Sequence, residues 1–384
     1  MPIRFACFVA FTALLQAPAF AQPACTARDT PDLAAELPEQ VLFSHCMAEG
    51  KCGAIDKTGA WKVPPVHRDL MIEGDFIVVP ENDDWSAYGF LDSDGTRLGG
   101  GDYSISIEEQ IPVSEGLMSV IVGEKTGYAD RTGTLVIPAE FDEAFAFQGG
   151  LAAVSIGGRR AFIDPKGKTV LTVPEGLDDV YAFDGDVAVA GKDGVYGLIG
   201  RDGQFVLAPK FSSLYFDHGV LIALDGERMG IVNEAGEWVS EESFETVGAF
   251  SNGLAPAQQN GKWGFIDTCG NWEIEPKFDQ AIGFDGGPAR VKLGEKWGLI
   301  GRDGAEIYAP QAAFIGDGVW TDGLVTFTLD DEKFGLLDTS GKVVVEPQYT
   351  SIEPIGGGVV LAYSGEDEKL LDLAGNQIPI APAP

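Results

Sequence analysis

The sequence predicts an all-β protein, a tandem array of about ten three-stranded antiparallel repeats of about 34 residues each. Three observations support this fold class. A glycine-bounded turn template recurs ten times at nearly constant spacing, a β-prone run follows each turn, and in five copies an aromatic residue stands eight positions after the closing glycine. With 45% apolar and 10% aromatic residues in 384, the chain can bury a substantial core.

The turn template is G-Φ-Φ-[D/G/N]-x-x-G, where Φ is apolar. Eight copies keep both glycines and begin at Gly53, Gly89, Gly127, Gly197, Gly230, Gly264, Gly298 and Gly335. Two further copies, beginning at Ala161 and Lys369, keep only the closing glycine, and the spacing of closing glycines runs from 33 to 38 residues. The aspartate carboxylate is expected to accept hydrogen bonds from turn amides while the closing glycine supplies a positive φ, which makes each copy a hairpin turn. The structural turn residues of the best-preserved copies are Gly264, Asp267, Gly270, Gly298, Gly304, Gly335, Asp338 and Gly341.

The segments that follow each turn predict two more strands. A β-prone run such as 134–137 or 342–345 comes first, and a proline usually ends it because proline removes a backbone donor. The aromatic residues at the fixed position are expected to anchor the connection in the core. They are Phe141, Phe211, Phe244, Phe278 and Tyr349. A third strand, as at 150–155, then returns to the next turn.

Two architectures fit such an array. The ordered part opens with a third-type strand at 40–43 and ends with a second-type strand at 377–380, and this offset would let the two ends complete one unit of a closed ring. Propellers, however, usually have four strands per blade and four to eight blades. The sequence therefore favours an open solenoid or superhelical ribbon, with a closed propeller-like ring or rings as the alternative.

Three copies carry a family resemblance. Lys262-Trp263-Gly264, Lys296-Trp297-Gly298 and Lys333-Phe334-Gly335, with the E-P-K/Q-[FY] runs at 275–278 and 346–349, resemble bacterial WG-repeat (KWG-repeat) proteins. The resemblance covers roughly residues 41–380 and is strongest over 227–350. It implies an all-β repeat protein, often exported, whose family function is not well defined. It brings no catalytic residues.

The ends of the chain predict export. Residues 1–21 resemble a signal peptide, with Arg4, an apolar core and an Ala19-Phe20-Ala21 cleavage site, followed by a leader at 22–40 with one short helical turn expected around 33–36. The repeat array then occupies 41–380, and 381–384 form a flexible tail. No later segment is long and apolar enough for insertion into a membrane. We expect a periplasmic or extracellular protein.

The charge excludes one class of partner. Removal of the signal peptide takes one of the 26 Lys and Arg residues, which leaves 25 against 59 Asp and Glu, a formal net charge of 25 − 59 = −34. A field of this sign repels nucleic acid and anionic membrane surfaces. We therefore expect no nucleic-acid partner and, with the apolar runs described above, no membrane insertion.

Four cysteines remain after cleavage, and an oxidising compartment favours disulfides between them. Cys46 and Cys52 flank a short stretch typical of a hairpin turn, so we favour that pair, with Cys25–Cys269 as its companion. Two other pairings remain open.

The sequence predicts no enzyme, cofactor or metal site. The serines stand in no G-x-S-x-G context, the three histidines occupy non-equivalent repeat positions, and no phosphate loop or dinucleotide fingerprint is present. Acidic turns such as 92–95 hold too few acids for an EF-hand, so we expect their aspartates to cap the turns.

Two functional hypotheses remain. The first is a non-catalytic exported module that binds another protein or acts as a scaffold in the cell envelope. The alternative is a carbohydrate or cell-wall binding module that uses aromatic stacking. Trp263 and Trp297 precede the same glycine in adjacent repeats and are the candidate binding residues, although a packing ladder between repeats is the favoured explanation of this pattern.

Overall fold

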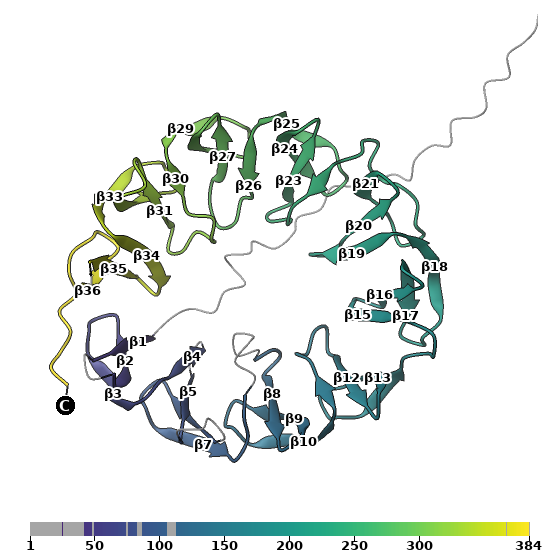
Figure 1. Cartoon of the computed structure of the whole chain (residues 1–384), viewed down its shortest axis with the longest axis horizontal. Coiled ribbons are helices and arrows are strands. Elements are labelled where there is room, and N and C mark those ends of the chain that lie inside the picture. The colour runs from purple at the N-terminus through teal and green to yellow at the C-terminus, as the bar shows by residue number, and fades with distance from the viewer. Residues whose placement is uncertain are drawn as a thin grey trace, which may run out of the picture.

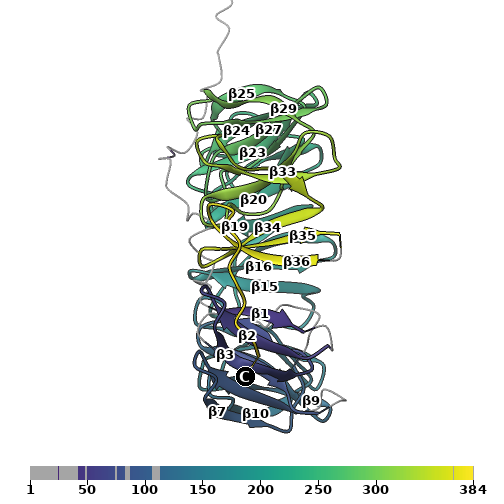
Figure 2. The ribbon, with the colours of Figure 1, turned by 90° about the vertical axis from the view of Figure 1, so that its left-hand side faces the viewer.

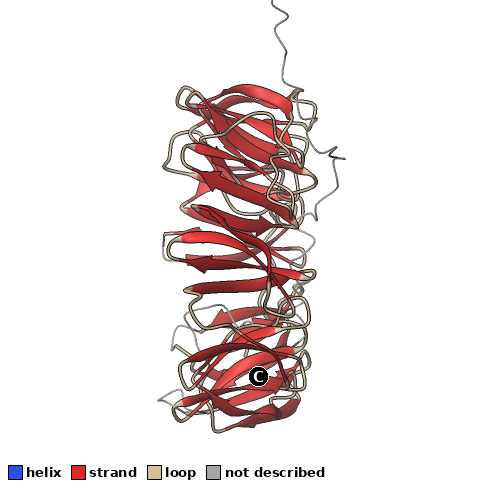
Figure 3. Cartoon of the chain, turned by 90° about the vertical axis from the view of Figure 1, so that its right-hand side faces the viewer, coloured by secondary structure: helices blue, strands red, loops and turns tan. Residues whose placement is uncertain are grey.

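The computed structural model describes residues 25, 42–47, 50–73, 76–82, 87–105, 113–365 and 367–383. The predicted signal peptide, the expected helical turn at 33–36 and the whole leader except Cys25 lie outside these residues. Within them the chain consists of strands and loops without a helix (Figure 3). The prediction of an all-β repeat protein is confirmed.

The described strands form ten small antiparallel sheets, and these sheets are arranged as the blades of one closed ring (Figure 1). Seen edge-on, the ring is a flat disc (Figure 2). The expectation of an open solenoid was wrong, and the alternative of a propeller-like ring is confirmed. We number the blades 1 to 10 from the N-terminus.

The first five blades contain eighteen strands. Blade 1 holds β1 (Leu42–Cys46), β2 (Cys52–Asp56) and β3 (Trp61–His67); blade 2 holds β4 (Met71–Glu73), β5 (Phe76–Pro80), β6 (Tyr88–Asp92) and β7 (Arg97–Gly101); blade 3 holds β8 (Leu117–Val122), β9 (Lys125–Asp130) and β10 (Leu135–Phe141); blade 4 holds β11 (Glu143–Ala144), β12 (Ala152–Ile156), β13 (Arg159–Ile163) and β14 (Thr169–Thr172); blade 5 holds β15 (Asp179–Asp184), β16 (Val187–Lys192), β17 (Val195–Gly200) and β18 (Phe205–Phe211).

The remaining blades follow the same pattern. Blade 6 holds β19 (Ser213–Asp217), β20 (Val220–Asp225) and β21 (Arg228–Ile231); blade 7 holds β22 (Thr246–Val247), β23 (Leu254–Gln259), β24 (Lys262–Asp267) and β25 (Trp272–Phe278); blade 8 holds β26 (Gln280–Ile282), β27 (Ala289–Leu293), β28 (Lys296–Ile300) and β29 (Glu306–Ala312); blade 9 holds β30 (Phe314–Ile315), β31 (Leu324–Thr328), β32 (Phe334–Asp338) and β33 (Val343–Tyr349); blade 10 holds β34 (Ser351–Gly356), β35 (Val359–Ser364) and β36 (Asp367–Asp372).

Each blade is a meander in which neighbouring strands follow one another in the sequence. In blades 5 and 6 the first strand lies on the inner side of the ring and the last on the outer side (Figure 1). The sequence predicted three strands per unit, but six of the ten sheets have four. The additional strand is the inner one. β22 and β30 have only two residues and therefore lack a recognisable sequence pattern, whereas β15 of blade 5 has six residues.

The opening glycine of the template allows the third and fourth strands to approach closely. A Cβ atom at Gly298 would lie 2.6 Å from the carbonyl oxygen of Tyr308 and 2.9 Å from the nitrogen of Pro310. The pairing of β28 with β29 is interrupted by register shifts at this position, as expected for a β-bulge. In blade 4, where Ala161 replaces the glycine, Ala161 pairs regularly with Thr172 and the shift beside the glycine position is missing.

The turn aspartates act as predicted. Oδ1 of Asp267 accepts hydrogen bonds from the backbone N–H groups of Cys269 and Asn271, each at 2.8 Å, and the Gly270 N–H donates to the Asp267 carbonyl oxygen. In blade 9, Asp338 accepts the equivalent two bonds from the N–H groups of Ser340 and Lys342. Burial raises the pKa of Asp338, but its hydrogen bonds, led by the one from the Ser340 side chain, outweigh burial and lower the pKa.

The closing glycines have a second role that the sequence did not indicate. All ten have positive φ, between 73° and 82°. Each also packs against the outermost strand or segment of the preceding blade. A Cβ at Gly304 would lie 3.6 Å from the side chain of Ile274, and one at Gly236 would lie 2.8 Å from the side chain of Leu207. A side chain here would therefore strain the turn and press the two blades apart.

The apolar core consists of ten separate clusters, one at each contact between adjacent blades. The aromatic residues at the fixed position lie in these clusters and are buried, as predicted: they are Phe141, Phe211, Phe244, Phe278 and Tyr349. Each blade therefore packs its apolar side chains only against the two blades beside it, and each completes the core of the next.

Blades 1 and 10 close the ring. Ile55 of blade 1 and Leu370 of blade 10 share one apolar cluster. Residues 377–381 continue past β36 and reach blade 1, where the Ala381 N–H donates to the Gly59 carbonyl oxygen and Trp61 Nε1 donates to the Ala381 carbonyl oxygen, both at 2.9 Å (Figure 2). The two ends therefore lie in adjacent blades and do not complete one unit, and residue 381, placed by the sequence in a flexible tail, is held by blade 1.

A carboxylate at the start of several blades caps a hairpin of the same blade. Asp279 Oδ2 accepts a hydrogen bond from the Gly294 N–H at 2.7 Å. Its Oδ1 forms an ion pair with Lys262 Nζ of the preceding blade at 2.5 Å. The bond from Lys262 is the main reason that the pKa of Asp279 is lowered. Lys125 and Asp142 form the same pair between blades 3 and 4. The lysine two residues before the opening glycine thus links adjacent blades at Lys262 and at Lys125.

Candidate binding site on the inner wall of the ring

The structure places the two predicted tryptophans in different inter-blade cores. Trp297 is only 8% exposed and lies in the cluster between blades 8 and 9, whereas Trp263 is half-buried against the cluster between blades 7 and 8. They are not brought together in one cluster. Their burial favours a packing role, and their role as ligand-binding residues stays a prediction.

The cysteines pair as the sequence favoured. Cys46–Cys52 joins β1 to β2 across the first hairpin, with Cα atoms 3.9 Å apart. Cys25–Cys269 joins the segment before blade 1 to the turn of blade 7, with Cα atoms 5.8 Å apart. Cys269 therefore has a structural role that explains why it occurs in one turn only.

The first strands expose three aromatic side chains at equivalent positions of consecutive blades. Phe145 of blade 4, Tyr181 of blade 5 and Tyr215 of blade 6 are 55%, 53% and 37% exposed. Each directly follows the first two paired residues of its inner strand, and at Tyr181 the pairing of β15 with β16 shifts register. The equivalent residues in blades 7 to 10 are Gly248, Ile282, Gly316 and Glu353. We call Phe145, Tyr181 and Tyr215 the aromatic ladder.

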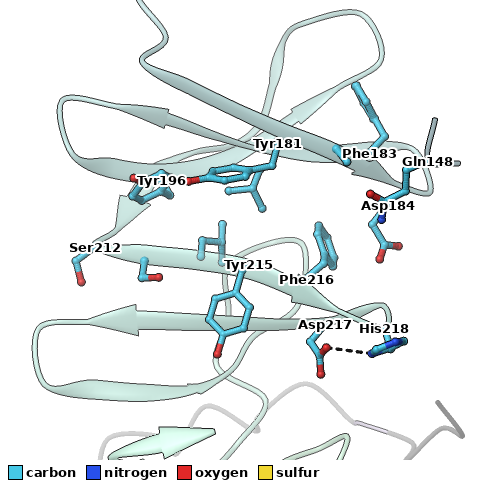
Figure 4. Close-up of a pocket in the computed structure, with 14 residues that line it drawn as sticks. Gln148, Tyr181, Phe183, Asp184, Tyr196, Ser212, Tyr215, Phe216, Asp217 and His218 are labelled. Atoms are coloured by element: carbon cyan, nitrogen blue, oxygen red, sulfur yellow. Dashed lines mark hydrogen bonds and ion pairs between the residues drawn. The ribbon is translucent and has the colours of Figure 1, made fainter. Parts of the chain in front are cut away.

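A cavity of about 730 Å³ opens between blades 5 and 6 beside this ladder. Tyr181 and Tyr196 contribute from blade 5, and Tyr215 and Phe216 from β19 of blade 6 (Figure 4). The Tyr181 and Tyr196 rings are 6.3 Å apart. The neighbouring Tyr181 phenol is the main cause of a raised pKa at Tyr196, with contributions from burial and from Asp179. At neutral pH the Tyr196 phenol is therefore an uncharged hydrogen-bond donor on an apolar ring.

Carboxylates lie at the opposite end of this cavity from Tyr196 (Figure 4). Asp217 Oδ1 contacts His218 Nδ1 at 3.0 Å and its Oδ2 accepts the Phe250 N–H of blade 7 at 2.5 Å, so both oxygens are already engaged. Asp184 is partly exposed at the end of β15, and among the described residues no hydrogen bond or ion pair holds its carboxylate. Asp184 is thus the carboxylate that a ligand can reach.

A second cavity of about 470 Å³ lies between blades 4 and 5 and shares Tyr181 with the first. Its lining is mainly apolar and includes Phe145, Leu151 and Phe162. Arg160 Nη1 lies 3.8 Å from Asp179 Oδ1 and donates to the Asp178 carbonyl oxygen at 3.1 Å. The guanidinium of Arg160 therefore already has partners within the protein. The two cavities form a continuous surface across three blades.

A third cavity, of about 520 Å³, lies between blades 1 and 2 and is lined by several cationic side chains. Arg97, one of them, is paired with Glu81. No exposed aromatic ring lies among its described lining residues, which distinguishes it from the cavities at the aromatic ladder.

Arg290 is a buried cation outside these cavities. Its Nη2 donates to the Gly318 carbonyl oxygen at 2.5 Å, and its guanidinium lies 5.3 Å from the centre of the Trp320 ring. Burial lowers its pKa to about 10, against the opposing effect of Asp285 and Asp317. Arg290 and Trp320 hold the inner loops of blades 8 and 9 together, since Trp320 Nε1 also donates to the carbonyl oxygen of residue 288.

The larger cavity contains serine, histidine and aspartate, but not as a catalytic triad. Ser212 and His218 stand before and after β19, six residues or about 20 Å apart along an extended strand, and Figure 4 shows them at opposite ends. Ser212 Oγ donates to the Leu224 carbonyl oxygen. Nucleophilic catalysis requires hydrogen-bonding distance between the hydroxyl and the imidazole.

The described part of the chain contains neither a metal-binding cluster nor a membrane-spanning helix. No group of three His, Cys, Asp or Glu residues there is arranged to hold a metal ion. None of its segments forms a helix long and apolar enough to cross a membrane.

Sequence reasoning missed the aromatic ladder because it concentrated on residues that recur in every repeat. The signal was available, since Phe145 and Tyr215 each stand four residues after the buried aromatic of their repeat, Phe141 and Phe211. Aligning that position across the repeats reveals aromatic residues in the middle of the chain and glycine, isoleucine or glutamate later.

Comparison with solved structures gives matches of low identity along most of the chain. A crystal structure of the eukaryotic initiation factor is 11% identical, with 88% of this chain and 94% of that chain covered and a TM-score of 0.48. BamB from Moraxella catarrhalis is 12% identical, with 88% and 98% covered and a TM-score of 0.37. The computationally designed protein Ika8 is 14% identical, with 69% and 92% covered and a TM-score of 0.35.

A comparison with curated proteins finds no match. Five segments of the chain match the family described as WG containing repeat: 127–159, 196–226, 229–263, 263–297 and 334–363. These segments fall in blades 3 to 10 and include the K-W-G motifs at Trp263 and Trp297. The chain is therefore a WG-repeat-containing protein.

Proposed function

We propose that this protein is a non-catalytic binding module that holds another protein against the aromatic ladder on the inner wall of its ring. The observation that carries the proposal is the exposure of Phe145, Tyr181 and Tyr215 at equivalent positions of three adjacent blades. Large exposed aromatic side chains are enriched at protein interfaces, where they contribute much of the binding energy. The two cavities beside them provide pockets for the partner's side chains.

We further propose that the protein works in the cell envelope or outside the cell. The signal-peptide pattern at the N-terminus supports export. The Cys25–Cys269 and Cys46–Cys52 bridges support an oxidising compartment, because disulfides rarely persist in the cytosol.

The proposal is tested with immobilised protein comprising residues 22–384. We expect proteins captured from an envelope extract at near-physiological salt to be lost in a variant that replaces Phe145, Tyr181 and Tyr215 by Ala. The control is Phe205→Ala, because Phe205 is 41% exposed but lies on β18 at the outer side of blade 5. An unchanged set of captured proteins in the triple variant would contradict the proposal.

The carbohydrate alternative is favoured by one observation, the partial exposure of Trp263. Sedimentation with purified peptidoglycan tests it. If the tryptophans bind glycan, the Trp263→Ala, Trp297→Ala double variant stays folded and loses sedimentation. If they only pack between blades, the double variant loses stability instead.

A further inference from the structure

We infer that the cavity between blades 5 and 6 binds the cationic side chain of a lysine or arginine on an extended segment of the partner protein. This inference rests on the proposed function and specifies the chemistry of the partner. Two features of the cavity support it, namely its aromatic ring faces and its charge.

The ring faces come from both walls of the cavity. Tyr181 lies on β15 and its ring projects toward β19, and Phe216 of β19 projects back toward β15, whereas Tyr215 projects from the opposite face of β19 (Figure 4). A cation within about 6 Å of an aromatic ring is attracted to its face, and Tyr is among the effective partners. The Tyr196 phenol, which also lines the cavity, remains uncharged at neutral pH, because the neighbouring Tyr181, burial and Asp179 all raise its pKa.

The charge of the cavity has one sign. The described residues that line it include Asp184 and Asp217 but neither Lys nor Arg. Asp217 is already engaged by His218 and Phe250, which leaves Asp184 to neutralise an incoming cation. Arg201 is not among these lining residues; it donates to Asp186 Oδ1 at 3.1 Å, and its guanidinium lies 5.3 Å from the centre of the ring of Phe183, which lines the cavity.

The charge of the whole chain acts in the same direction. A formal net charge of −33 attracts a cationic segment from a distance and repels an anionic one. The neighbouring cavity between blades 4 and 5 shares Tyr181 and has an apolar lining, so it fits an apolar side chain of the same segment. A peptide with one cationic and one apolar residue, lying across blades 4 to 6, uses both cavities.

The experiment uses fluorescent Gly/Ser octapeptides that carry one Leu and one Arg at varied separation. In matched peptides, Lys, Glu or the uncharged arginine analogue citrulline replaces Arg. Binding to protein comprising residues 22–384 is followed by fluorescence polarisation. We expect the Arg and Lys peptides to bind, the citrulline peptide to bind about tenfold more weakly, and added salt to weaken binding of the charged peptides.

Two conservative variants localise the cation. Asp184→Asn is expected to weaken the Arg peptide by about fivefold to tenfold and to leave the citrulline peptide unchanged. Asp186→Asn is the matched control, because Asp186 is two residues away on the same turn but faces Arg201. It is expected to change affinity by less than about twofold. Circular dichroism confirms that both variants are folded.

Several results would overturn the inference: equal binding of Arg and citrulline peptides, no binding of either cationic peptide at about 1 mM, or displacement of the peptide by peptidoglycan fragments. The proposed function fails separately. If the triple aromatic variant loses its captured partner while Arg and citrulline peptides bind equally, the inner wall remains the docking surface and only the cation is wrong. If cationic peptides bind but the triple variant still captures the partner, the proposed function is wrong.

Discussion

Replacement of Gly298 by Ala tests whether the opening glycine is required by close approach of the third and fourth strands. The added Cβ would lie 2.6 Å from the Tyr308 carbonyl oxygen, whereas ordinary contacts of a Cβ begin at 3.4 Å. The backbone of β29 must therefore move by roughly 3.4 − 2.6 = 0.8 Å, against Pro310, whose nitrogen would lie 2.9 Å from the same Cβ. Overpacking of this kind costs about 1–3 kcal/mol, and a clash with backbone rather than a flexible side chain places Gly298→Ala near the upper value.

The assay is guanidinium unfolding followed by tryptophan fluorescence and circular dichroism. Gly318→Ala is the control, because Gly318 has nothing within 4 Å of the added Cβ and no positive φ. This control is expected to be neutral or to stabilise by up to about 1 kcal/mol, through the unfolded chain. If the two variants agree within about 0.5 kcal/mol, the steric explanation of the opening glycine is refuted.

Three further predictions concern the core, the charges and the disulfides. Phe278→Ala removes a buried ring from the core between blades 7 and 8 and is expected to lower the free energy of unfolding by about 3–5 kcal/mol in the same assay. Asp279 has a lowered pKa, so the stability it contributes is present above the ordinary carboxyl pKa of about 4 and is lost as the pH falls through its lower folded value. Melting temperatures measured between about pH 2 and 7 should therefore decline less steeply on acidification in Asp279→Asn. Cys269→Ser opens a bridge of sequence separation 244, and the chain-entropy model gives a loss of about 5 kcal/mol in the free energy of unfolding. Cys52→Ser opens a bridge of separation 6, for which the same model gives a loss of about 2 kcal/mol. Equal losses of the two variants in unfolding experiments would contradict this explanation.

The local features of the fold could be predicted because each depends on a few neighbouring residues. Asp267 and Gly270 define a hairpin through backbone hydrogen bonds within five residues, and Phe278 is placed in a core by its fixed distance from that turn. The Cys46–Cys52 pair follows from the same hairpin geometry.

The global arrangement could not be predicted from the repeat. Whether ten units form a ribbon or a ring depends on the small rotation between neighbours, which no single repeat encodes. The decisive contacts involve residues outside the repeat pattern, such as the hydrogen bonds of Ala381 to Gly59 and Trp61. Four-stranded blades were missed because inner strands such as β22 are only two residues long.

The candidate site was missed for the opposite reason. Repeat analysis finds what all copies share, and Phe145, Tyr181 and Tyr215 matter because the later copies lack them. Exposure, which separates a ladder of binding residues from a row of core residues, depends on which strand lies innermost. That position became visible only in the ring.

The manner of closure has a consequence for biosynthesis. The residues that join blade 10 to blade 1 are 377–381, which leave the ribosome after every other part of the ring. Until then the apolar faces of both end blades, including Ile55 and Leu370, are open to water and to other nascent chains. A chain truncated before residue 377 would thus keep both end faces open, and we expect it to aggregate more readily than the complete ring.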